Sequence, residues 1–243
     1  MTTPSTHELF LALDATWPPA RFINHSPWLL REGAGGGQRV SAATAMAEVC
    51  ESDIASAEAG MRVLDQHPLF MLKPGEDALD DWLEARTYEI VDPVAIYLKP
   101  LTRDALAVTD AEVRSDWPPD ADALDLWAGG GIGPARIAVM ARAGGAKTAL
   151  VLKDGATCSG VAFVAIYNRI AMLHALEVAP SGRRLGFGTR LMNAAAHWAT
   201  ANGAAWLSLM VTRANVPANA LYRGLGMTEV GAYHYRRAPK AKS

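Results

Sequence analysis

The second half of the chain alternates between two hydrophobic periods. Apolar residues that alternate with polar ones, or that form short unbroken runs, predict strands, and apolar residues three to four positions apart predict helices. The predicted strands are Lys147–Leu152, Cys158–Tyr167, Ile170–Val178, Ala205–Thr212 and Glu229–Arg237. The predicted helices are Ile132–Ala143, Thr189–Asn202 and Pro217–Arg223. This order, in which strands and helices mostly alternate, indicates an α/β sandwich with a mixed sheet.

The first half shows a less regular pattern. Its predicted strands are Trp28–Gly33, Gln38–Ser41, Leu69–Lys73 and Tyr88–Leu98, and its predicted helices are Ile54–Gln66 and Asp77–Ala85. We expect two domains, residues 1–110 and 115–243, joined by a linker at Thr109–Asp120, where Pro118 and Pro119 break the pattern.

An internal repeat is one explanation of the first domain. The helix-then-strand segment 80–91 can be laid over segment 220–230 with slight identity, which leads to the hypothesis that the domain is a degenerate copy of the second. The alternative is an α/β cap domain of other origin. In either case this domain is expected to shape the acceptor site.

Composition restricts the class of partner. Half of the 243 residues are hydrophobic, and the formal net charge of −2 argues against a dedicated nucleic-acid-binding protein. No apolar run approaches the roughly 20 residues that span a bilayer, and the N-terminus lacks the features of a signal peptide. Cys50 and Cys158 have no metal or redox spacing, which favours a reducing compartment. We therefore expect a cytoplasmic protein with no metal, nucleic-acid or membrane partner.

Residues 178–191 join an apolar strand to a helix through a basic, glycine-rich turn. The first turn of a helix has unpaired N–H groups and a partial positive charge, and glycines let an anion approach the backbone. Arg183 and Arg184 add formal charge, so the turn predicts a phosphate site. Leu191 stands where a dinucleotide-binding fingerprint needs its third glycine, and the Walker ending is missing.

The spacing Arg183-x-x-Gly186-x-Gly188 resembles the pyrophosphate-binding motif of the GNAT acetyltransferases. A second segment, Asn215-x-x-Ala218-x-x-Leu221-Tyr222 with Gly226-Met227, is similar to another element of that family, with Met227 in place of the usual Phe. The resemblance covers roughly residues 115–238. It implies the GNAT acyltransferase fold, in tandem if the first domain is a second copy, and acetyl-CoA as acyl donor.

The resemblance also implies which residues bind the donor. They are Val178, Arg183, Arg184, Leu185, Gly186, Phe187, Gly188, Thr189, Asn215 and Ala218. In the family the strand that ends at Val178 separates from the next one, so that its backbone can hold the pantetheine arm and the thioester oxygen. Asn215 matches the residue that hydrogen-bonds this arm, and a helix N-cap is its structural alternative.

The general base is sought on the same strand. Period two places His174 and Val178 on one face and Glu177 on the other. His174 is the first candidate because imidazole titrates near neutrality, and a packed, hydrogen-bonded histidine is the alternative. Glu177 is the second candidate, although it faces the wrong way unless a bulge shifts the register.

Tyr222 matches the family tyrosine that protonates the departing thiolate, and an aromatic residue packed in the core is its alternative. The expected reaction is direct transfer of acetyl to a primary amine in a ternary complex. The alternative is an acyl-CoA-binding regulatory module without turnover. The sequence does not determine whether the acceptor is a small molecule or a peptide. It also leaves open the size of the acyl group and the oligomeric state. The glycines of Gly129–Gly133 are interpreted as a flexible entry to the helix at Pro134.

Overall fold

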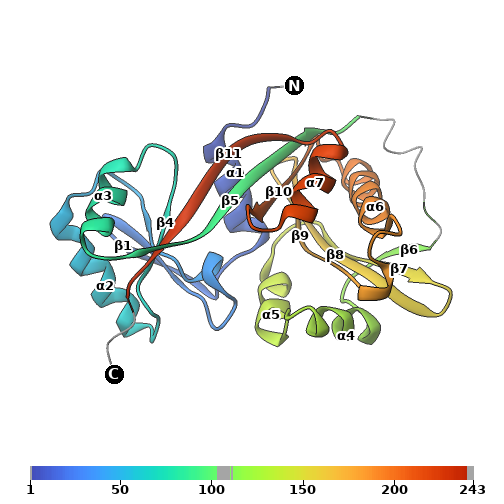
Figure 1. Ribbon diagram of the computed structural model, residues 1–243, viewed down its shortest axis with the longest axis horizontal. Helices are drawn as coiled ribbons and strands as arrows, with labels where there is room; N and C mark the ends of the chain where they lie inside the picture. Colours follow the sequence, from blue (N-terminus) through green and yellow to red (C-terminus); the bar gives the residue numbers. More distant parts are fainter. Residues whose placement is uncertain (1, 103–109, 111, 240–243) are drawn as a thin grey trace. The chain divides into compact units, whose positions relative to one another are not determined.

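The computed structural model of the chain describes residues 2–102, 110 and 112–239 (Figure 1). Within this part the strands form a three-stranded sheet of order β1-β2-β3 and an eight-stranded sheet of order β4-β11-β5-β10-β9-β8-β7-β6. The chain divides into two compact units. The first contains residues 1–18, 96–210 and 216–230, and the second contains residues 19–95, 211–215 and 231–243.

The elements have the following bounds. The strands are β1 Arg21–His25, β2 Trp28–Glu32, β3 Thr44–Ala45, β4 Leu69–Leu72, β5 Glu89–Pro100, β6 Val113–Asp116, β7 Lys147–Asp154, β8 Thr157–Tyr167, β9 Ile170–Val178, β10 Trp206–Thr212 and β11 Thr228–Arg237. The helices are α1 Thr6–Thr16, α2 Ile54–Val63, α3 Asp77–Ala85, α4 Ala121–Gly129, α5 Pro134–Arg142, α6 Phe187–Ala201 and α7 Val216–Gly224. Every helix of the described residues is too short or too polar to cross a bilayer.

In the first unit, helices cover both faces of the sheet. On β8, a Cβ at Gly160 would touch Leu191 of α6, whereas the ring of Phe163 lies against Trp17, which directly follows α1. Residues 160 and 163 differ by an odd number of positions, so their side chains point to opposite faces. Therefore α6 covers one face of the sheet and α1 the other. Helix α4, which packs on β8 and β9, lies away from α6 (Figure 1).

The predicted elements of the second half are confirmed, most of them within two residues, and β9 has the predicted bounds. Among the described residues, five α-helices and strands were not predicted: α1, β1, β3, β6 and α4. Helix α1 had a readable signal, because Ser5 and Glu8 form a capping box. The strand predicted at Gln38–Ser41 is wrong: Gln38–Val40 is a 3-10 helix, and β2 pairs with β1 and β3 instead.

The expected linker is partly wrong as well. Residues 109 and 111 lie outside the described part, but Val113–Asp116 forms β6, which pairs antiparallel with β7. The chain also does not divide into its two compact units at residues 110–115, where the domain boundary was expected. Helix α1 belongs with the first unit because it packs on β8 and β9, and β5 and β11 each pass from one unit into the other. The hypothesis of a degenerate second copy stays a prediction.

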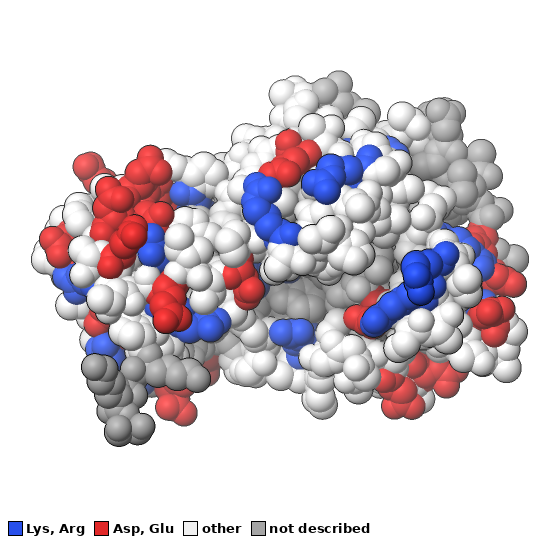
Figure 2. All heavy atoms as spheres, viewed as in Figure 1, with Lys and Arg blue, Asp and Glu red and all other residues white. Residues whose placement is uncertain are grey.

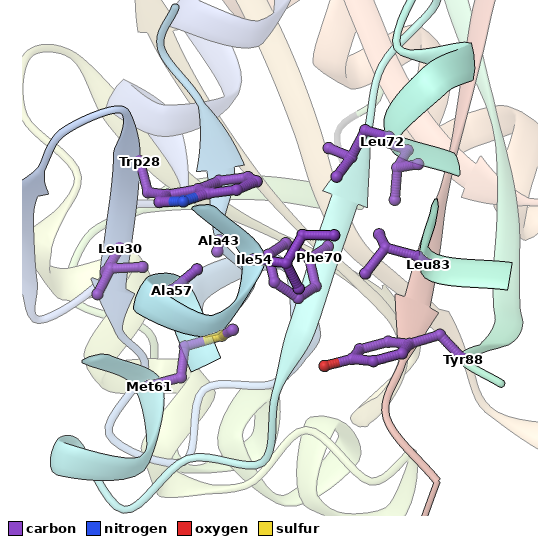
Figure 3. Close-up of a cluster of buried hydrophobic side chains, with 11 residues drawn as sticks. Trp28, Leu30, Ala43, Ile54, Ala57, Met61, Phe70, Leu72, Leu83 and Tyr88 are labelled. Atoms are coloured by element: carbon purple, nitrogen blue, oxygen red, sulfur yellow. The ribbon is translucent and has the colours of Figure 1, made fainter. Parts of the chain in front are cut away.

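The second unit has its own hydrophobic core (Figure 3). Trp28 of β2, Phe70 of β4 and Tyr88 are its aromatic members, and the ring centroids of Phe70 lie 5.2 Å from Trp28 and 5.8 Å from Tyr88 in edge-on geometry. Aliphatic side chains of α2 and α3 complete this core. A small unit with this many fully buried side chains gains most of its stability from them.

A buried arginine of β11 forms hydrogen bonds to α3 in the same unit. Arg236, only 4% exposed, donates from Nε to Asp80 Oδ1 at 2.6 Å and from Nη1 to the Tyr88 carbonyl at 3.0 Å. Burial raises the pKa of Asp80, but the hydrogen bonds from Arg236 and His234 lower the pKa more, so it lies below its ordinary value. Asp80 is therefore ionised whenever the unit is folded near neutral pH.

We predict that Asp80→Asn lowers the free energy of unfolding at neutral pH by about 2 kcal/mol, since it leaves a buried guanidinium without its main counter-charge. A carboxyl with a lowered folded pKa stabilises above its unfolded pKa, about 3.9, and this contribution is lost as pH falls through the folded pKa. The difference from wild type should therefore shrink below about pH 4. Denaturant unfolding at several pH values measures it, with Asp81→Asn, exposed on the same helix, as control. Equal losses in both variants would contradict the assignment.

Candidate active site

Strand β9 separates from β10 halfway along its length. The two strands pair in parallel from Ile170 opposite Trp206 to Leu173 opposite Leu209. Both strands continue, β9 to Val178 and β10 to Thr212, but their ladder ends at Leu173. The edge of residues 174–178 that faces away from β8 therefore has no strand partner among the described residues. This agrees with the separation expected at this strand.

A bulge interrupts β9 where the two strands separate. On β8, Phe163 pairs with His174 and Val161 pairs with Glu177, so β9 has one extra residue between these two pairs. Ala175, in the bulge, has a φ of +51°. Its carbonyl accepts a hydrogen bond of 2.8 Å from the indole Nε1 of Trp127, a fully buried residue of α4.

The bulge corrects the prediction about the faces of β9. Cross-strand partners point to the same side of a sheet, and Val161 and Phe163 are two residues apart on a regular strand. His174 and Glu177 therefore share a face, and Val178, opposite Gly160, points to the other. The period-two assignment of His174 and Val178 to one face is wrong, because the extra residue reverses the alternation.

His174 is enclosed by residues at the end of α1. Its side chain is 4% exposed, and its ring centroid lies 4.9 Å from that of Trp17 and 6.2 Å from that of Phe163. His174 Nε2 lies 2.9 Å from Thr16 Oγ1, and this hydroxyl donates to the Ala12 carbonyl at 2.6 Å. A hydroxyl has one hydrogen, so Thr16 accepts from Nε2–H, which fixes the hydrogen of a neutral imidazole on Nε2.

Glu177 stands in a more open place. Its side chain is 24% exposed, and one carboxylate oxygen lies 3.6 Å from a guanidinium nitrogen of Arg183. A Cβ at Gly130 would lie 2.8 Å from the Glu177 carboxyl carbon, so a larger residue at position 130 would displace the Glu177 side chain from this place. The run at Gly129–Gly133 thus ends α4, begins α5 and makes room for Glu177.

The predicted phosphate turn follows directly after β9. Arg183, Arg184 and Leu185 are exposed, and basic side chains gather over this turn in Figure 2. Gly186 is the N-cap of α6 with a φ of +82°, a left-handed conformation that favours glycine, and it has no side chain to cap the first N–H groups. Uncapped N–H groups at the start of a helix, with the helix dipole, favour an anion at that position.

The start of α6 lies against α7. A Cβ at Gly188 would come within 2.9 Å of Leu221 Cδ2, so a glycine allows the close approach of the two helices. Phe187 is buried, whereas Gly188 and Thr189 are partly exposed beside the turn. The sequence motif therefore contains one glycine for backbone conformation and one for packing.

Tyr222 of α7 is 5% exposed, and burial raises its pKa to about 12. Its ring lies 5.9 Å from that of Tyr97. The Tyr97 hydroxyl donates to Asn219 at 3.1 Å, a contact that was not predicted. Ala218 lies partly buried on α7, and Asn215, exposed just before the helix, belongs to the segment 211–215 of the second unit.

Sequence reasoning missed the residues that surround β9. Trp127, Gly130, Thr16 and Trp17 come from elements that were not predicted or were interpreted as irregular. The available signals were the capping box before α1 and Asp120 as the N-cap of α4. Over the residues with described positions, no three His, Cys, Asp or Glu side chains come together as metal ligands would.

Comparison with known proteins gives consistent matches. The profile described as "Acetyltransferase (GNAT) family" matches residues 110–227. The uncharacterized N-acetyltransferase YobR of Bacillus subtilis is 25% identical over 233 residues, 91% of this chain and 94% of that protein.

Two solved structures share the fold over nearly the whole chain. The GCN5-related N-acetyltransferase from Kribbella flavida has a TM-score of 0.71 at 16% identity and covers 99% of this chain and 98% of its own. A functionally unknown conserved protein from Staphylococcus epidermidis has a TM-score of 0.68 at 12% identity, with 93% and 96% covered. At these identities the likeness concerns the fold alone.

Proposed function

Residues 110–227 belong to the acetyltransferase (GNAT) family, which makes the chain an acyltransferase, and we propose that it transfers acetyl from acetyl-CoA to a primary amine. The observation that carries the proposal is the separation of β9 from β10 directly before the glycine turn. An open strand edge suits an amide-rich arm, and the start of a helix suits the phosphates at its end. Acetyl-CoA has both groups in this order.

The donor would lie along β9. Its pyrophosphate would accept hydrogen bonds from the first N–H groups of α6, within the segment Gly186–Thr189, with Arg183 and Arg184 nearby. The pantetheine arm would pair with the free edge of β9, and the Val178 N–H would hydrogen-bond the thioester oxygen. Ala218, from the second motif, completes the proposed contacts.

Tyr222 suits the role of a hydrogen-bond donor to the departing sulfur. With a pKa of about 12 it stays protonated at neutral pH. An ordinary thiol has a pKa of about 8.5, so full transfer of the phenol proton to the thiolate is uphill by about 5 kcal/mol. Tyr222 therefore stabilises the developing negative charge and keeps its proton, while the thiolate is protonated from solvent or from the amine.

Glu177 is our choice for the general base. The bulge brings it to the face of His174, and its carboxylate is accessible beside Gly130. His174 remains the alternative, although its ring is stacked on Trp17 and hydrogen-bonded to Thr16. A base must come within hydrogen-bond reach of the amine or of a bridging water, which favours the more exposed group.

A binding module without turnover is the alternative function. It would share the phosphate turn and the open strand edge, but it would have no use for Tyr222 and Glu177 as reacting groups.

The reaction of the proposed enzyme would be direct, with the amine attacking the thioester in a ternary complex. The acceptor is an amine on a small molecule or a peptide.

We predict that Leu185→Glu weakens acetyl-CoA binding about tenfold relative to Leu185→Gln, because it adds a negative charge where the pyrophosphate is expected. Leu185 is 63% exposed, so neither change disturbs the core, whereas a substitution at Gly188 would press on Leu221. Calorimetric titration of acetyl-CoA measures the affinities. Equal affinities in the two variants would contradict the proposed phosphate site. A wild type that does not bind acetyl-CoA would contradict the proposed function.

We predict that Tyr222→Phe lowers kcat at least tenfold and leaves the Kd of acetyl-CoA within about twofold, since it removes only a hydrogen bond made in the transition state. Steady-state kinetics with an amine found by screening, together with calorimetry, test this. Unchanged kcat would show that Tyr222 is a packing residue. A wild type that binds acetyl-CoA but acetylates none of a broad amine panel would favour the regulatory module.

For the base, we predict that Glu177→Gln lowers kcat about 100-fold, because it removes the carboxylate proposed to accept the proton of the amine. His174→Gln should cost less than about tenfold in kcat, with a lower melting temperature because it disturbs a packed ring. The opposite order of the two losses would assign the base to His174.

A further inference from the structure

We propose that Trp127 is a positioning residue that holds β9 in its bulged form; the inference rests on the proposed acetyl-CoA site. Trp127 would touch neither the donor nor the acceptor. It would act through the backbone of Ala175, which precedes Glu177, the proposed base, and Val178, whose N–H is proposed to hydrogen-bond the thioester oxygen. A residue of α4 would thereby determine how well β9 binds the pantetheine arm.

The bulge has a conformational cost. Ala175 has a φ of +51°, a region that residues with a Cβ avoid. In a regular strand Ala175 would adopt an extended conformation instead. The chain therefore needs an interaction that exists in the bulged form and is lost in the regular one.

Trp127 provides such an interaction. Its indole has a single N–H, which donates to the Ala175 carbonyl at 2.8 Å. The side chain is fully buried, so an indole N–H without this acceptor would be expensive. Straightening β9 would turn the carbonyl away and leave the buried donor without it. The hydrogen bond thus favours the bulge over the regular strand.

Helix α4 holds this donor at a fixed place. At its N-terminus, the N-cap Asp120 accepts from the Ala123 N–H at 3.0 Å and pairs with Arg114 of β6. In the first turn Asp122 pairs with Lys153 of β7 at 2.7 Å. The helix is thus tied to two strands at one end and reaches the bulge of β9 at the other.

The same end of α4 also limits where Glu177 can lie. Gly130, three residues after Trp127, leaves room for the Glu177 carboxylate, which a Cβ at position 130 would displace. Without the extra residue, period two would turn Glu177 toward the α6 face. The two contacts, at Ala175 and at Glu177, together favour one conformation of β9.

The test is calorimetry with two ligands. Acetyl-CoA probes the whole site, and adenosine 3′-phosphate 5′-diphosphate, which lacks pantetheine, probes the phosphate turn alone. We expect Trp127→Phe to weaken acetyl-CoA about tenfold, the effect of one lost hydrogen bond, and to change the affinity for the fragment less than about twofold. Trp82→Phe, in α3 of the second unit, is the matched control and should change neither affinity.

A rescue separates positioning from packing. Glycine adopts a positive φ without the cost of a Cβ, so the double variant Trp127→Phe with Ala175→Gly should regain at least about threefold in acetyl-CoA affinity. A residue that only fills space would not be rescued in this way. Should Trp127→Phe fail to fold, benzothienylalanine at position 127 keeps the bicyclic shape, lacks the N–H and takes its place in both experiments.

The outcomes are distinct. Three results would overturn the positioning role and leave the proposed function intact. They are an unchanged acetyl-CoA affinity in the Trp127 variant, an equal loss of affinity for both ligands, and no recovery of affinity with glycine at position 175. A wild type that does not bind acetyl-CoA would overturn both.

Discussion

The hydrogen bond between the Trp127 indole and the Ala175 carbonyl stands at the point where the sheet of the first unit opens. Before this point β9 pairs on both sides, and after it β9 pairs with β8 alone among the strands that the structure describes. Sheets normally satisfy backbone groups across each ladder, so an edge that opens within a sheet must be stabilised by other contacts. The bulge, the buried indole and the neighbouring glycine of α4 supply them here.

The phosphate turn depends on a different kind of constraint. Two glycines with different tasks begin α6: Gly186 takes a left-handed conformation, and Gly188 lets Leu221 of α7 approach. The turn therefore links the start of α6 to the helix that bears Tyr222. The start of α6 and the buried phenol of Tyr222 are thus held by one packing arrangement.

The second unit is stabilised by its own aromatic core and by the buried guanidinium of Arg236. A buried charge is tolerated only with partners, and Asp80, Glu84 and the Tyr88 carbonyl provide them. All three lie on or just after α3. The unit thus combines burial of apolar side chains with the hydrogen bonds of Arg236, and these hydrogen bonds hold α3 against β11.

The sequence by itself determined the element order of the second half, the position of the glycine-rich turn before α6 and the family of residues 110–227, because periodicity, glycines and short motifs are local signals. It predicted Tyr222 to be either the donor to the departing thiolate or an aromatic residue packed in the core, and the structure shows that Tyr222 is buried. Tertiary structure alone decided the face of Glu177. A single extra residue in β9 reverses the alternation, and no local pattern marks it, since Ala175 is a residue that ordinarily avoids a positive φ. The partner that stabilises it, Trp127, lies 48 positions away in the chain, and only folding brings such a donor and acceptor together.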